Sequence, residues 1–109
     1  MKNLKKVGLL AMDPTITKPE FEKIKPQALI IDVRDNWEHQ QLKKLSNSIN
    51  VPFLELVSKP EKYIPNKNQL VITYCNFGNR SGQAAQILRE KDYPALVLEG
   101  GIERYFSKN

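Results

Sequence analysis

The sequence is poor in cysteine and histidine, with one residue of each among 109. A single thiol cannot form an internal disulfide, and one cysteine with one histidine cannot build a tetrahedral structural zinc site. We therefore expect a domain that folds without disulfides, metal or cofactor. A lone thiol is also typical of a reducing compartment, so we predict a cytoplasmic protein.

Long hydrophobic runs are missing as well. No stretch approaches the roughly 20 apolar residues of a membrane span. The apolar stretch at residues 7–12 follows a basic start, but it is shorter than the roughly 7 to 15 residues of a secretory core. We expect no export signal and no membrane contact. Residues 1–14 are predicted to form an arm or short amphipathic helix, and residues 15–109 a single domain.

Dense basic clusters are absent too, although the net charge is +5. That charge favours association with anions. The lysines are scattered along the chain and are not interleaved with aromatic residues, so nucleic-acid binding is not expected. With 40% hydrophobic and 27% charged residues, the composition is that of a folded globular domain.

Strand-like and helix-like segments alternate along the chain. Thr17 with Glu20 and Asp35 with Glu38 have the spacing of capping boxes, so each pair marks a helix start. Other helices are expected at 53–58, 82–91 and 102–106. Continuous apolar runs typical of strands covered on both faces lie at 28–33, 70–74 and 95–98, with a brief strand at 48–51. This alternation predicts a three-layer α/β/α fold with a mostly parallel sheet.

The lone Cys75 directly follows the strand at 70–74, where ligands bind in open α/β sheets. The next residues lead into a helix, so backbone N–H groups and the helix dipole can stabilise an anion there. Gly78 can adopt a positive φ and lets the loop curl. Because the thiolate is the reactive form of cysteine, this position favours a nucleophile over an inert buried thiol.

Side chains around the loop suggest further roles. Arg80 can stabilise a thiolate or hold an anionic substrate. Asp32 and Arg34 end a neighbouring strand, and an ion pair that supports the loop is expected of them. Phe77 either packs inward or stays exposed as a partner contact, and Ser81 either donates to the thiolate or caps the helix. His39 is expected to be exposed to solvent.

These motifs together resemble those of the rhodanese-like sulfurtransferase family. The matching segments are Asp32-Val33-Arg34 followed by Glu38, Asn50-Val51-Pro52, Tyr74 to Ser81, and Leu98 to Gly101 before the aromatic Tyr105. The resemblance spans residues 15 to 106. Two departures are the lack of a Gly-His pair in Lys43 to Ser48 and a tyrosine where the family usually has tryptophan.

The resemblance implies a compact domain with a parallel sheet of about five strands and a catalytic Cys75 that carries sulfur as a persulfide. It implies that the substrate is held by the loop and the residue after it, namely Asn76, Phe77, Gly78, Asn79, Arg80 and Ser81. The implied partners are a small anionic sulfur donor such as thiosulfate and a thiol, protein or cyanide acceptor.

Two other functions remain open for the same fold. A cysteine phosphatase or arsenate reductase has a longer C-x5-R loop, usually preceded by histidine, whereas Cys75 to Arg80 is C-x4-R and Tyr74 precedes it. A noncatalytic protein-binding module would not need both Cys75 and Arg80. We therefore favour sulfur transfer.

Overall fold

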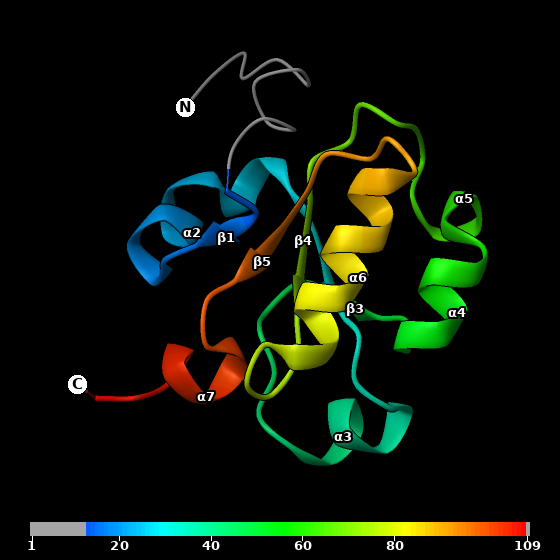
Figure 1. Ribbon diagram of the computed structural model, residues 1–109. Helices are drawn as coiled ribbons and strands as arrows, with labels where there is room; N and C mark the ends of the chain where they lie inside the picture. Colours follow the sequence, from blue (N-terminus) through cyan, green and yellow to red (C-terminus); the bar gives the residue numbers. More distant parts are fainter. Residues whose placement is uncertain (1–12, 109) are drawn as a thin grey trace.

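The computed structural model describes residues 13–108, and in them five strands form one parallel sheet (Figure 1). The strand order is β1-β5-β4-β2-β3. The strands are β1 (Thr15–Ile16), β2 (Leu29–Asp32), β3 (Ser48–Asn50), β4 (Val71–Tyr74) and β5 (Ala95–Leu98). All four strand pairings are parallel, as the unbroken apolar runs predict.

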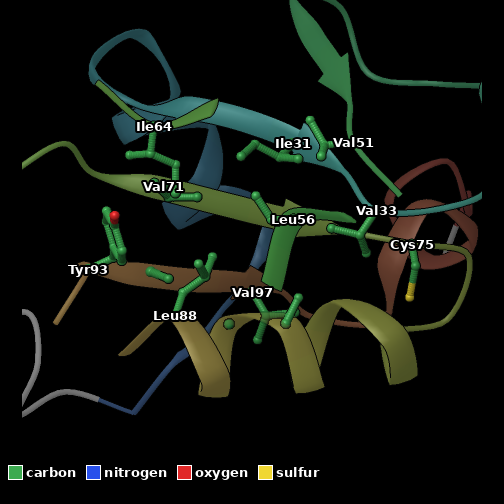
Figure 2. Close-up of a cluster of buried hydrophobic side chains, with 13 residues drawn as sticks. Ile31, Val33, Val51, Leu56, Ile64, Val71, Cys75, Leu88, Tyr93 and Val97 are labelled. Carbon is green, nitrogen blue, oxygen red and sulfur yellow. The ribbon is translucent and has the colours of Figure 1, made fainter. Parts of the chain in front are cut away.

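Helices cover both faces of the sheet and make the expected three layers (Figure 1). The helices are α2 (Lys18–Ile24), α3 (Asn36–Gln41), α4 (Phe53–Ser58), α5 (Pro60–Tyr63), α6 (Asn79–Glu90) and α7 (Gly101–Tyr105), with a 3-10 turn η1 at Lys25–Gln27. One apolar cluster joins α4 and α6 to the sheet (Figure 2). A second joins α2 and α7 to the opposite face.

Alternation along the central strands sends neighbouring residues into different clusters. Ile31 packs in the cluster under α6, and Ile30 in the cluster under α2. On β4 the same alternation places Tyr74 with α2 and the following Cys75 with α6. Side chains one residue apart on a strand point to opposite faces, so the strand register decides which helix the thiol meets.

Register also brings the carboxyl ends of three strands to one level. Asp32 pairs with Asn50 of β3 on one side and with Tyr74 of β4 on the other. The chain therefore leaves β2, β3 and β4 at the same edge of the sheet. The loops that follow these strands meet there.

The two predicted capping boxes are present. Thr17 and Glu20 exchange side-chain and backbone hydrogen bonds at the start of α2. Asp35 and Glu38 form the second box, at the start of α3. These bonds satisfy N–H groups that the first turn of a helix leaves without partners.

Helix α6 begins at Asn79, three residues before the predicted start at position 82. Gly78 precedes it with φ +111° and turns the chain into the helix at once. The prediction was wrong because Asn79, Arg80 and Ser81 resemble loop residues in composition. They form the first turn of the helix.

Other boundaries differ as well. Helix α3 ends at Gln41, and Leu45, which follows it, packs in the cluster under α2. The two-residue strand β1 and the short helix α5 were not predicted. Residues 1–12 of the predicted arm at 1–14 lie outside the described part of the chain.

Candidate active site at Cys75

Cys75 lies where β4 gives way to α6, and its sulfur faces the first turn of that helix (Figure 2). The backbone N–H groups of Gly78 and Ser81 approach Sγ at 3.1 and 3.4 Å, and Ser81 Oγ lies 3.2 Å away. The residue is only 2% exposed. Two backbone amides at a helix start therefore aim at one sulfur atom.

The first turn of α7, which follows β5, holds the backbone of the Cys75 loop. The N–H groups of Ile102 and Glu103 donate to the carbonyls of Cys75 and Asn76 at 2.8 and 3.0 Å. A Cβ on Gly101 would lie 2.5 Å from each of these carbonyl oxygens, and Gly101 has φ +65°. Only glycine fits this contact without strain. The backbone of the loop is thereby fixed.

The side chain of Arg80 is held by Glu38. Its two terminal nitrogens donate to the two carboxylate oxygens of Glu38 at 2.8 and 3.1 Å. The bidentate hydrogen bonds from Arg80 are the largest cause that lowers the pKa of Glu38 to about 2, while burial opposes the shift. Arg80 was predicted to face the thiolate or an anion; the structure places its guanidinium on this carboxylate.

Asn76 links two parts of the site. Its amide nitrogen donates to Glu38 at 2.9 Å, and its oxygen accepts from Arg34 at 2.9 Å. Arg34 is fully buried and paired with Asp32, which is also fully buried. Burial alone would raise the pKa of Asp32, but hydrogen bonds from Arg34 and His39 lower it. The structure thus contains the expected ion pair, and a hydrogen bond connects it to the loop.

The other predicted site residues differ in their surroundings. Phe77 is 69% exposed, which decides between its two predicted placements. Asn79 is exposed on the first turn of α6. Ser81 is fully buried beside the sulfur, and because Gly78 is the N-cap, Ser81 does not cap the helix. His39 was expected in solvent, but its Nδ1 lies 2.8 Å from Asp32 Oδ2 and its side chain is 18% exposed.

Sequence reasoning missed two residues of the site. Glu38 was noted only as a capping residue and a family match, and Gly101 only as part of a segment that matches the family. Glu38 could have been found by asking which carboxylate pairs with Arg80. The signal for Gly101 was the doubled glycine after β5, since a positive φ is cheap only for glycine.

A groove of about 530 Å³ opens beside the loop. Asn76 and Arg34 lie on its wall together with Lys43 and Phe106. Within residues 13–108, no three histidine, cysteine or acidic side chains gather in a way that could hold a metal ion. None of the helices in that range is long and apolar enough to cross a membrane.

The fold and the site place the protein in the class of parallel α/β proteins with a cysteine at the carboxyl edge of the sheet. Comparison with known proteins defines the family. The model of the rhodanese-like domain matches residues 17–108. Thiosulfate sulfurtransferase PspE of Escherichia coli is 36% identical over 98 residues, which cover 90% of this chain and 89% of PspE.

Solved structures agree with this assignment. A rhodanese-related protein of Thermoplasma volcanium superimposes with a TM-score of 0.76 at 26% identity, covering 85% of this chain and 90% of its own. The human single-domain sulfurtransferase TSTD1 has the same fold, with a TM-score of 0.77 at 23% identity over 90% of this chain and 99% of TSTD1. The chain belongs to the rhodanese-like domain family and is a rhodanese-type sulfurtransferase.

Proposed function

We propose that the protein moves sulfane sulfur from an anionic donor such as thiosulfate to a thiol, protein or cyanide acceptor through a persulfide on Cys75. The observation that carries the proposal is the approach of two backbone amides and one hydroxyl to a single sulfur, at 3.1 to 3.4 Å. Donors already in place can stabilise the Cys75 thiolate that attacks in the first step and leaves in the second, because they need not reorganise during the reaction.

In the first step, the Cys75 thiolate attacks the outer sulfur of thiosulfate. The S–S bond of the donor breaks, and sulfite leaves with the bonding electron pair. Cys75 keeps the transferred sulfur, and the persulfide carries the negative charge. The amides of Gly78 and Ser81 stabilise the Cys75 thiolate before this step and the persulfide anion after it.

In the second step, an acceptor thiolate or cyanide attacks the outer persulfide sulfur, and the Cys75 thiolate leaves. Cys75 is the single cysteine of the sequence, so no second thiol of the chain can convert the persulfide to a disulfide. The sulfur therefore passes to another molecule. The exposed Phe77, next but one after Cys75, offers a contact for an acceptor protein.

The same lone thiol supports the cytoplasm as the proposed location, because a reducing compartment keeps Cys75 available for donors. We assign this chemistry to residues 15–109 as one domain, since every contact described for the site lies within them.

Mass spectrometry of the intact protein after exposure to thiosulfate tests the proposal. The wild type is expected to gain the mass of one sulfur atom, and cyanide should remove it with formation of thiocyanate. Cys75→Ser should show neither event. An unmodified wild type that hydrolyses p-nitrophenyl phosphate instead would contradict sulfur transfer and favour the phosphatase alternative.

A further inference from the structure

The carboxylate of Glu38 is the main side-chain anchor of the active-site loop. It accepts two hydrogen bonds from Arg80 and one from Asn76. It also accepts the backbone N–H of Asp35 at 2.9 Å. Its side chain is 9% exposed, so the carboxylate is enclosed by these partners. Two of them, Asn76 and Arg80, belong to the loop that surrounds the sulfur.

This contact changes the electrostatic character of the loop. Both terminal nitrogens of Arg80 are engaged by one carboxylate, so its positive charge is balanced within the site. Asp32 balances Arg34 in the same way. The groups at Sγ that attract an anion are the two amides and the start of α6, whose dipole amounts to roughly half a charge. Lys43 lies on the wall of the groove beside the loop.

A carboxylate held at the loop repels a donor with two negative charges more strongly than a donor with one. We propose that Glu38 is a positioning and specificity residue that makes the loop prefer monoanionic organic sulfur donors, such as thiosulfonates and persulfides, to dianionic thiosulfate. The exposed ring of Phe77 lies on the same loop and offers an apolar contact for the organic group. This inference rests on the proposed sulfur transfer and names the donor class of that site.

Methanethiosulfonate and thiosulfate make a matched pair of donors for the test. Each carries its transferable sulfur on a sulfonyl sulfur. With methanethiosulfonate, the Cys75 thiolate bonds to the outer sulfur, the S–S bond breaks, and methanesulfinate leaves with the electron pair. The bonds formed and broken are the same as with thiosulfate. The donors differ by one negative charge and a methyl group.

The measurement is kcat/KM for both donors with cyanide as the acceptor, at low ionic strength. In Glu38→Gln, the ratio of kcat/KM for thiosulfate to that for methanethiosulfonate should rise roughly threefold to tenfold, as expected when one charge a few ångströms away is removed. The change should appear mainly in the KM for thiosulfate. Glutamine can still accept the capping hydrogen bond from Asp35.

Glu20 supplies the matched control, because it holds the same capping-box position in α2. Glu20→Gln removes the same charge from the same place in a helix, away from Arg80, and should leave the donor ratio unchanged. A ratio in Glu38→Gln that stays within about twofold of the wild type would overturn the inference. An equal rise in both variants would overturn it too.

A second comparison keeps the inference testable if Glu38→Gln does not fold. Arg80→Gln leaves the Glu38 carboxylate without its cation, and the double variant Glu38→Gln/Arg80→Gln removes that lone charge. The ratio of kcat/KM for thiosulfate to that for methanethiosulfonate should be higher in the double variant than in Arg80→Gln alone. Equal ratios would overturn the inference. If the wild type transfers sulfur from neither donor, the proposed function itself fails; wild-type transfer with an unmoved ratio refutes the donor preference alone.

Discussion

Glu38 connects the chemistry of the site to the stability of the protein. Hydrogen bonds from Arg80, against the opposing effect of burial, bring its pKa from the ordinary 4.5 to about 2. A carboxylate with a lower pKa in the folded than in the unfolded state stabilises the fold above its unfolded pKa. That stabilisation is complete above about pH 5 and is lost as the pH falls through the folded value near 2.

The difference in stability between wild type and Glu38→Gln should therefore depend on pH. At neutral pH the variant should be less stable by about 1 to 3 kcal/mol, a range that allows for screening of the partly exposed Arg80. The difference should shrink between about pH 5 and pH 2 as Glu38 of the wild type becomes protonated. Urea unfolding at neutral pH and in steps down to about pH 2.5 measures it. A difference that stays constant over this range would show that the carboxylate is not paired in the folded state.

Single residues differ in how far the sequence predicts their roles. Cys75 and the pair of Asp32 and Arg34 could be placed because each lies at the end of a recognisable strand. The partner of Arg80 could not, since Glu38 is 42 positions away and meets it only when α3 and α6 are both in position. His39 was misplaced for the same reason: its helix face looks polar in sequence, but Asp32 lies beneath it.

At the scale of elements, replacing glycine by alanine is expected to have opposite effects on stability at Gly101 and at Gly82. In Gly101→Ala the new Cβ would overlap the carbonyl oxygens of Cys75 and Asn76 at 2.5 Å, at a φ that L-residues rarely adopt. We expect a loss of at least about 2 kcal/mol in stability and weaker sulfur transfer, because the loop must move.

Gly82 on α6 is the control for this change. A Cβ there would meet nothing within 4 Å, and the residue is helical. Gly82→Ala should therefore stabilise the protein by about 0.5 to 1 kcal/mol through helix propensity. Thermal unfolding of both variants, together with the kcat/KM for thiosulfate, measures the contrast. A harmless Gly101→Ala would show that the contact between the loop and α7 is not tight.

Element types could be predicted here more securely than element ends. The unbroken apolar segments identified β2, β4 and β5 because short continuous apolar runs are typical of strands buried on both faces. The start of α6 was placed too late, since the left-handed turn at Gly78 leaves polar residues to form the first helical turn. This boundary matters for function because it places the amide of Ser81 against the sulfur.

For the whole molecule, the sequence indicated the layers but not the order of the strands. Alternating strands and helices require a parallel sheet with covered faces. They do not say that β4 lies between β2 and β5, which sets Cys75 among the ends of three strands. Strand β1 was missed because two residues carry no detectable period. Val97 of β5 donates to the carbonyl of Pro14, just before β1, at 2.7 Å, and Glu99, just after β5, donates to the carbonyl of Ile16 at 2.9 Å.

This edge strand leads to a prediction about where the stable domain begins. A chain that starts at Asp13 keeps Ile16, which is 3% exposed, and the capping residue Thr17. It should unfold within about 1 kcal/mol of the full chain. A chain that starts at Lys18 loses the buried isoleucine and the cap and uncovers the edge of β5, so it should be about 3 to 5 kcal/mol less stable. Urea unfolding followed by circular dichroism compares the two. If the chain from Asp13 lost as much as the chain from Lys18, residues 1–12 would contribute to the core, and the boundary at position 15 would be wrong.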